Sequence, residues 1–252
     1  MRWKKRLSDK EEAMLATLLE QTEGWVAKHF NKRISFPITR WLMGTSITPN
    51  QITTVNLMLG IVAAWGVASV SWGWRVVGAC LMQLSSILDG CDGEVARLKS
   101  MQSKTGAWFD TVADDCVNDL FFVALFVGLV RTTGDSIYWV VGWINVVLSA
   151  GATAIIYQQL LAKGQGANAK DFQPTWQEKS RTKKSWFDWV RPIMKRDFFI
   201  VILLVFILLD QRPIVFWMGV VGTTVTFLLY SVSFVLSLKS KLCQGVGHER
   251  GL

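Results

Sequence analysis

The chain has 252 residues, a formal net charge of +8, and a composition that is 51% hydrophobic with 13 Trp. Apolar segments recur from Thr48 to the region of Lys239, which favours one integral-membrane domain over two soluble ones, and the positive charge fits a cytoplasmic excess beside anionic lipid better than a nucleic-acid partner. The four cysteines form no Cys-x2-Cys pair and the two histidines lie far apart, which argues against a zinc site, a disulfide framework and a histidine-based centre.

Residues 1–47 form a basic lead of mixed polarity, which we expect on the cytoplasmic side of the membrane. Leucine and aromatic residues recur at helix-like intervals between Leu15 and Phe30, with Lys28, Lys32 and Arg33 beside them. This pattern predicts an amphipathic helix that lies in the membrane interface. A solvated helix packed on the protein's own cytoplasmic face explains the pattern equally well.

The segment Thr48-Pro49-Asn50 predicts the start of the first membrane helix, because Thr48 can cap a helix and Pro49 suits its first turn. From there the pattern predicts six apolar spans, at roughly 50–71, 75–96, 107–130, 136–161, 197–210 and 213–238. We therefore predict an all-α, polytopic membrane protein in which six transmembrane helices follow the amphipathic interfacial helix. Residues 48–239 would form the membrane domain and residues 240–252 a cytoplasmic tail.

The distribution of Lys and Arg predicts the topology. With the N-terminus in the cytoplasm, the external loops contain only Arg75, Arg131 and Arg212, which leaves 24 of the 27 basic residues on the cytoplasmic side. The charge excess therefore predicts that both termini lie inside. The short loop between the second and third spans, residues 98–105, then also lies in the cytoplasm.

The longest predicted loop, residues 163–196, is cytoplasmic in this topology and rich in Lys and Arg. Most of these charges are typical of a solvated loop on the positive side of a membrane. Arg191, Lys195 and Arg196 stand just before the fifth span and could turn inward, so they are candidate ligands for the phosphate of an anionic acceptor.

Two pairs of aspartates interrupt the second and third spans where these approach the cytoplasmic loop. Asp89 and Asp92 share a helix face at the end of the second span, and Asp110 and Asp114 share one near the start of the third. If the two helices are neighbours, the four carboxylates converge. In a low dielectric such a cluster takes up protons or binds a divalent cation.

The candidate ligands are carboxylate oxygens with no His or paired Cys nearby, which selects Mg²⁺, Mn²⁺ or Ca²⁺ over zinc or copper. Magnesium usually completes its shell with phosphate oxygens, so we expect a diphosphate or nucleotide substrate. Small residues between the aspartates would leave space for this substrate, namely Gly90, Gly93, Ala96 and Gly106. Arg97 and Lys104 would add cations at the mouth of the site. Close helix packing and the positive-inside rule are the simpler explanations for the same residues.

The pattern Asp89-x2-Asp92-Gly93-x2-Ala96-Arg97-x8-Gly106-x3-Asp110-x3-Asp114 resembles, at every specified position, the signature of the CDP-alcohol phosphotransferase family of membrane enzymes. The resemblance implies transfer of a substituted phosphoryl group from a CDP-alcohol to an acceptor hydroxyl, with release of CMP. It implies that the four aspartates hold Mg²⁺ or Mn²⁺, that Asp114 is the general base, and that the enzyme is a homodimer. The implied CDP-binding residues are Asp89, Gly93, Ala96, Arg97, Gly106 and Asp110, with Lys104 as a further phosphate ligand.

Three further segments resemble one branch of this family, the di-myo-inositol phosphate phosphate synthase domains. They are Phe30 to Ser35, Ile47 to Thr53 and Arg196 to Phe199. The donor expected on this basis is CDP-inositol or CDP-diacylglycerol, and the product is an inositol phosphodiester or a phospholipid.

Two other functions fit the aspartates. Membrane prenyltransferases also set aspartate pairs against a metal-bound diphosphate, but they do not require Gly93, Ala96, Arg97 and Gly106 at this spacing. A cation transporter with an intramembrane carboxylate site would need a polar path, whereas residues 120–127 are apolar throughout. We therefore expect an enzyme whose active site lies at the cytoplasmic face.

Overall fold

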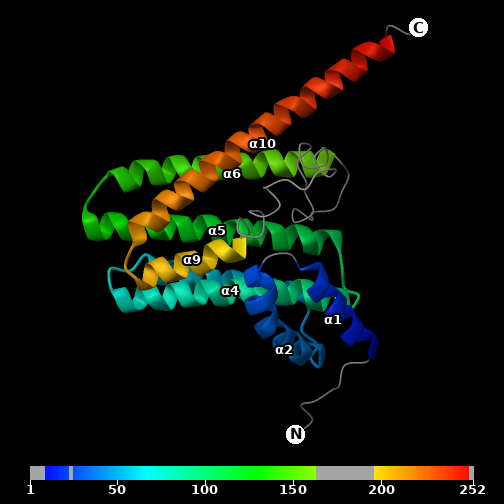
Figure 1. Cartoon of the computed structure of the whole chain (residues 1–252), viewed down its shortest axis with the longest axis horizontal. Coiled ribbons are helices and arrows are strands. Elements are labelled where there is room, and N and C mark those ends of the chain that lie inside the picture. The colour runs from blue at the N-terminus through cyan, green and yellow to red at the C-terminus, as the bar shows by residue number, and fades with distance from the viewer. Residues whose placement is uncertain (1–8, 23–24, 163–195, 250–252) are drawn as a thin grey trace.

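The computed structural model of the chain describes residues 9–22, 25–162 and 196–249. Every regular element in these ranges is a helix, which confirms the predicted all-α class. The elements are α1 Asp9–Gln21, the π-helical segment η1 Ala27–Asn31, α2 Lys32–Met43, α3 Pro49–Val67, α4 Trp72–Leu98, α5 Lys104–Thr133, α6 Ile137–Ala162, α9 Arg196–Leu208 and α10 Arg212–Glu249. Figure 1 shows α4, α5, α6 and α9 side by side in a bundle, with α1 and α2 at one end and α10 extending past it.

Each of the six predicted spans coincides with one helix, from α3 to α10. Helix α10 runs to Glu249, through most of the segment predicted as a tail, because residues 239–249 contain no proline to end it. By length and composition, two helices could cross a membrane, over Ile137–Leu161 and Arg212–Leu236, and Phe198–Leu208 is a shorter apolar helix. The six-span arrangement therefore stays a prediction.

The N-terminal lead forms three helical elements rather than one. Leu15 and Leu18 of α1 are buried against Leu98 at the end of α4, so α1 packs on the protein's own surface. In contrast, two tryptophans of the lead remain exposed: Trp25, which precedes η1, and Trp41, which lies in the last turn of α2. The lead thus combines a packed helix with exposed aromatic side chains.

The start of α3 is fixed by a capping box. Thr48 Oγ1 accepts a hydrogen bond of 3.4 Å from the Gln51 N–H, and Gln51 Oε1 accepts one of 3.0 Å from the Thr48 N–H. Lys99, just after α4, donates bonds of 2.8 Å to the carbonyls of Thr45 and Ile47, and burial lowers the pKa of its amine. The end of α4 is therefore tied to the segment that leads into α3.

Helix α3 packs closely against both α4 and α5. A Cβ at Gly66 would lie 2.8 Å from the Cα of Gly78, and one at Gly60 would lie 2.6 Å from Val117, so these glycines permit the helices to approach. Around them lies a core of buried apolar residues that includes Ala63, Val67, Met82, Phe121, Phe126 and Phe216. This packing positions the polar ends of the three helices.

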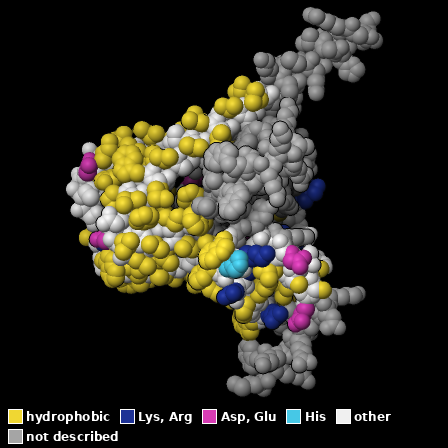
Figure 2. All heavy atoms as spheres, in the orientation of Figure 1, with side chains coloured by type: hydrophobic (Ala, Val, Ile, Leu, Met, Phe, Trp, Pro, Cys, Tyr) yellow, Lys and Arg dark blue, Asp and Glu magenta, His cyan; other side chains and the backbone are white. Residues whose placement is uncertain are grey.

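The outer surface of the bundle is largely apolar. Hydrophobic side chains cover its visible face, whereas the charged side chains in this view lie mainly over the N-terminal helices and at the opposite tip (Figure 2). Exposed apolar residues occur on every long helix, among them Val62, Val77, Val140, Val205 and Val221. An apolar belt between two charged ends is the surface expected of a protein embedded in lipid.

Candidate active site

The carboxylates of three predicted site residues gather at one end of the bundle. Asp89 and Asp92 lie near the end of α4, and Asp110 lies near the start of α5. Each offers a carboxylate oxygen, and these oxygens lie within 4.8 Å of one another. Because α4 and α5 both pack against α3, that helix sets how the aspartates face each other. Negative charge at this spacing is unfavourable unless a cation or protons neutralise it.

Asp92 is the most buried of the three, with 3% of its surface exposed. Its Oδ2 accepts a hydrogen bond of 2.7 Å from Thr53 Oγ1, and Thr53 lies near the start of α3. This bond fixes one carboxylate oxygen. The sequence analysis missed Thr53, because a contact across 39 positions leaves no periodic signal.

Asp114 lies four residues beyond Asp110 on α5 and is 7% exposed. It does not belong to the group of three carboxylates whose oxygens lie within 4.8 Å of one another. Among the described residues, the structure thus brings together three of the four predicted aspartates at this distance and sets Asp114 further along the same helix.

Two other acidic residues of α5 bind α6 instead. Tyr157 donates a hydrogen bond of 2.6 Å to Asp115, and Ser149 donates one of 2.7 Å to Asp119. The Tyr157 ring also packs edge-on against Trp108, with ring centroids 5.1 Å apart. These contacts hold α5 against α6 and give Asp115 and Asp119 structural partners.

A cavity of about 400 Å³ opens beside the carboxylates. Its walls come from the start of α3, the end of α4, the loop that follows α4 and the start of α5. The predicted site residues that line it are Asp92, Gly93, Ala96, Arg97, Lys104, Gly106 and Asp110. Asn50, Thr53 and Ser103 line it as well, although the sequence analysis did not identify them as site residues.

The two glycines of this cavity differ in the space around them. A Cβ at Gly93 would have no atom within 4 Å, so this position opens directly onto the cavity. A Cβ at Gly106 would lie 2.8 Å from Ser103 Oγ and 3.0 Å from Asn50 Oδ1. Because Ser103 Oγ also accepts a bond of 3.0 Å from the Gly106 N–H and so caps α5, a side chain at position 106 would disturb that cap.

Gly90 does not line the cavity, so of the two explanations that the sequence offered for it, close helix packing is the one that its surroundings fit. A Cβ there would lie 3.8 to 4.0 Å from Glu94, Lys32 and Ser35, which is ordinary contact between α4 and α2. Its absence from the wall follows from the helix period, since it faces away from Asp92.

Glu94 is a buried carboxylate that the sequence analysis did not identify, although it lies within the signature segment. It is 3% exposed, and its oxygens accept hydrogen bonds from three residues of one face of α2: Lys32 at 2.5 Å, Ser35 at 2.8 Å and Thr39 at 2.6 Å. The spacing of these three polar residues was the available signal, because it places them on one helix face. Glu94 therefore holds the lead against the segment that carries Asp92.

The structure describes the surroundings of only some of the predicted cationic site residues. Arg97 and Lys104 are exposed and line the cavity. Arg191 and Lys195 lie outside the described residues, and Arg196 is the first residue of α9.

The chain is similar in sequence to proteins of known activity. The chain is 36% identical over 118 residues to the bifunctional IPC transferase and DIPP synthase of Aquifex aeolicus, which covers 47% of this chain and 26% of that protein. The corresponding protein of Thermococcus kodakarensis is 41% identical over 103 residues, covering 41% and 23%. The chain thus spans about a quarter of the length of these relatives.

Solved structures share the fold. The crystal structure of Mycobacterium tuberculosis phosphatidylinositol phosphate synthase with CDP-DAG bound superposes with a TM-score of 0.53 at 20% identity, covering 82% of this chain and 92% of that one. The same enzyme in complex with manganese and citrate gives a TM-score of 0.51 at 18% identity, covering 81% and 87%. The family model described as CDP-alcohol phosphatidyltransferase matches residues 46–228, from the segment before α3 into α10, and the chain belongs to this family of membrane transferases.

Proposed function

We propose that the protein transfers a substituted phosphoryl group from a CDP-alcohol to an acceptor hydroxyl and releases CMP. The observation that carries the proposal is the cavity of about 400 Å³ in which carboxylates, small residues and two cations meet. A nucleoside diphosphate ester needs these three features together: charge neutralisation, space near the backbone, and cationic ligands for phosphate.

The metal-dependent chemistry of the family requires a place for a divalent cation. Asp89, Asp92 and Asp110 offer only carboxylate oxygens within 4.8 Å of one another, a donor set that fits Mg²⁺ or Mn²⁺. We infer that these three residues hold the metal, with Asp114 as a further ligand. When bound, the cation neutralises charge on the diphosphate and on the departing CMP.

The remaining residues of the cavity would position the donor. Gly93 and Ala96 leave room for the cytidine and its phosphates, and Gly106 keeps the opposite wall close to the backbone. Arg97 and Lys104 would contact phosphate oxygens at the mouth of the cavity. Thr53 orients Asp92 through its hydrogen bond of 2.7 Å.

Asp114 would take the proton of the acceptor hydroxyl. It is 7% exposed and lies four residues beyond Asp110 on α5, outside the group of three carboxylates whose oxygens lie within 4.8 Å of one another. A carboxylate in this position can act as general base within hydrogen-bond reach of an acceptor.

The donor alcohol and the acceptor are inferred from relatives. Proteins that resemble this chain act as bifunctional IPC transferase and DIPP synthase or as CDP-diacylglycerol–serine O-phosphatidyltransferase. We propose CDP-inositol or CDP-diacylglycerol as the donor, and an alcohol or phospho-alcohol as the acceptor. The product is then an inositol phosphodiester or a phospholipid, and Arg191, Lys195 and Arg196 are the candidate ligands of the acceptor.

We further propose six membrane-spanning helices, both termini and the active site on the cytoplasmic side, and a homodimer. The apolar belt of the bundle and the excess of Lys and Arg on the predicted inner side support the topology. The test is to introduce one cysteine, at residue 102 or at residue 135, into a variant that lacks the four native cysteines, and to label it with an impermeant maleimide. Residue 102 should react only from the cytoplasmic side, and the reverse result would invert the topology.

The activity is tested by incubating the purified protein with Mg²⁺, a panel of CDP-alcohols and a panel of acceptors, and by following CMP. We expect CMP release that stops in excess EDTA and returns with Mg²⁺ or Mn²⁺. Asp114→Asn should abolish transfer while it leaves donor binding largely intact. Release of inorganic diphosphate in place of CMP, or full activity in EDTA, would contradict the proposal.

A further inference from the structure

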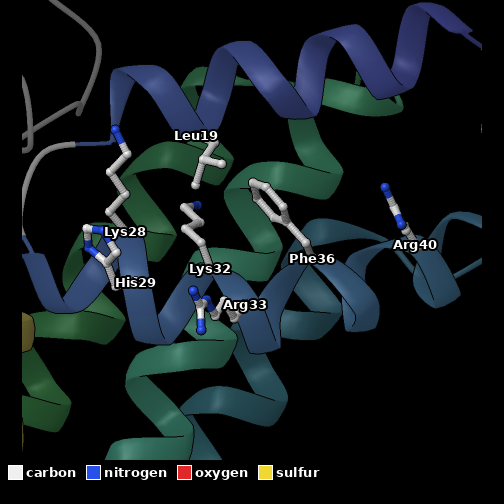
Figure 3. Close-up of a pocket in the computed structure, with 7 residues that line it drawn as sticks. All are labelled: Leu19, Lys28, His29, Lys32, Arg33, Phe36 and Arg40. Carbon is white, nitrogen blue, oxygen red and sulfur yellow. The ribbon is translucent and has the colours of Figure 1, made fainter.

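A second cavity, of about 350 Å³, lies among α1, η1 and α2 and shares no lining residue with the cavity beside the aspartates. Five of its seven lining side chains are Lys, Arg or His, namely Lys28, His29, Lys32, Arg33 and Arg40. The other two are apolar. Figure 3 shows Leu19 descending from α1 toward Lys32 and Phe36, which rise from α2.

The cations of this second cavity outnumber the carboxylates that contact them. Lys32 lies 2.5 Å from Glu94, and Arg40 lies 3.8 Å from Glu12 in an exposed pair. Within the described parts of the chain, no carboxylate approaches the head groups of Lys28 or Arg33 within 4.0 Å. The excess positive charge makes the cavity suitable for an anion.

The floor of the cavity is held in place. Lys32 is fixed by Glu94, which also accepts hydrogen bonds from Ser35 and Thr39. The Lys32 ammonium lies 5.5 Å from the centroid of the Phe36 ring, a cation–π contact. A ligand would therefore meet a pre-positioned cation, which reduces the ordering that binding requires.

Exposed aromatic residues lie on or beside the helical elements that form this cavity. Trp25, Phe30 and Trp41 are 68%, 48% and 49% exposed and lie on or beside the same helical elements. Tryptophan is enriched at membrane–water interfaces, and Lys and Arg reach from there to headgroup phosphates. Exposed aromatic residues together with cations are the composition expected at the level of lipid headgroups, where the phosphate groups of anionic lipids are available.

We propose that the cavity among α1, η1 and α2 binds a phosphate-bearing anion at the membrane surface, with Lys28 and Arg33 as its principal contacts. The anion is either the headgroup of an anionic phospholipid or a soluble phosphorylated compound. This binding site lies beyond the proposed transfer reaction and does not depend on it.

The test uses the full-length protein in a neutral detergent and follows its thermal unfolding. Short-chain phosphatidylglycerol is titrated in one arm, inorganic phosphate at constant ionic strength in a second, and short-chain phosphatidylcholine in a third. We expect a saturable rise in Tm with at least one of the two anions and none with phosphatidylcholine, because a ligand of the folded state stabilises it.

Variants assign the effect to the cavity. Lys28→Gln/Arg33→Gln should raise the half-saturating concentration about tenfold or more, since it removes two charge-assisted contacts. Lys28→Arg/Arg33→Lys keeps both charges and should stay within about twofold of the original protein, because the contacts are to a charge rather than to a fixed geometry. Arg131→Gln, which removes an exposed charge in the last turn of α5, should leave the titration unchanged.

A response to phosphatidylglycerol alone identifies a lipid headgroup, and an equal response to inorganic phosphate identifies a soluble phosphate group. Stabilisation by neither anion, or an unchanged titration in Lys28→Gln/Arg33→Gln, would overturn the proposal. If the double variant does not fold, the single variants Lys28→Gln and Arg33→Gln carry the same comparison, each with a smaller increase in the half-saturating concentration.

Discussion

At one end of the bundle three carboxylates lie within 4.8 Å of one another, whereas at the other end two buried arginines share one carboxylate. Arg75 lies 2.7 Å from Asp210 and also donates to the carbonyl of Val70. Arg212 lies 3.9 Å from the same carboxylate and donates a bond of 2.9 Å to Thr132. The arginine end thus carries its counter-charge within the chain.

The two ends differ in the signs of the charges that they bring together. At the arginine end, a backbone carbonyl, a hydroxyl and a carboxylate accept hydrogen bonds from the two guanidinium groups, whereas Arg75 Nε and Arg212 Nη1 are buried without a hydrogen-bond partner among the described residues. At the carboxylate end, like charges gather beside an open cavity. Clusters of like charge beside a cavity are typical of sites that bind a cation, whereas clusters that combine both signs of charge are typical of structural supports.

Asp110→Asn should produce the largest change, and it should appear in activity rather than in stability. Loss of a proposed metal ligand should lower CMP release by at least about 100-fold, because even the outer partners of a metal ligand are worth 10- to 100-fold. Without divalent cation, Tm should stay the same or rise, since the variant relieves repulsion among three carboxylates.

The matched control for this variant is Asp135→Asn. Asp135 is exposed before α6, where its Oδ1 accepts a bond of 2.9 Å from the Ile137 N–H, and Asn can accept the same bond. It should leave both CMP release and Tm unchanged. A stability loss in Asp110→Asn without divalent cation would show that the carboxylate group supports the fold.

Asp210→Asn should produce the opposite result, a loss of stability without a loss of specific activity. Arg75 and Arg212 are 4% and 5% exposed, so removal of their shared carboxylate leaves two buried cations facing each other. Because Asp210 itself is 54% exposed, we expect a decrease of about 1–3 kcal/mol in the free energy of unfolding. Its φ of 56° suits Asn as well as Asp, so backbone strain does not contribute.

Denaturant titration of the protein in detergent measures this change. The activity of the folded fraction should match that of the original protein, because the arginine cluster lies at the far end of α4 from Asp89 and Asp92. Arg75→Met is a useful second variant and should destabilise less, since it leaves only an exposed carboxylate behind. Equal stability of Asp210→Asn and the original protein would remove the structural role of the arginine cluster.

The contrast between the two ends also separates what the sequence predicts from what it does not. The helix period places Asp89 with Asp92, and the apolar pattern places the six long helices from α3 to α10, because both depend on local repeats. The charge count assigned Arg75 and Arg212 to external loops. The structure buries both, because they pair with Asp210, which is 135 positions from Arg75.

The same limit applies to the partners of the site. Thr53 and Glu94 acquire their roles only when α3 and α2 pack against α4. A Glu within an apolar segment and a stripe of polar residues on another helix are visible in the sequence, but their pairing depends on tertiary packing. Long-range pairs of this kind need a structure or covariation to detect.

Thr53→Val should have a moderate effect at the carboxylate end and none at the other. It keeps the shape of the side chain but removes the hydrogen bond of 2.7 Å that orients Asp92. We expect the Mg²⁺ concentration for half-maximal activity to rise about tenfold, the lower end of the range for outer partners of a metal. Thr54→Val is the control, because Thr54 is exposed and bonds only its own helix at Asn50. An unchanged Mg²⁺ requirement in Thr53→Val would mean that Asp92 needs no orienting bond.

Gly93→Ala should have the smallest effect and the most selective one. The new Cβ would meet no atom within 4 Å, and Ala favours a helix over Gly by about 0.5–1 kcal/mol, so stability should rise slightly. The methyl group would project into the cavity and compete with the donor, so KM for the CDP-alcohol should rise several-fold while kcat changes little. Gly222→Ala is the control, because a Cβ at Gly222 also meets no atom within 4 Å but lies in α10, away from the cavity. A higher KM in both variants would mean that a Gly-to-Ala change raises KM wherever it lies in the helices. A higher KM in Gly93→Ala alone would mean that the donor binds against the Gly93 side of the cavity.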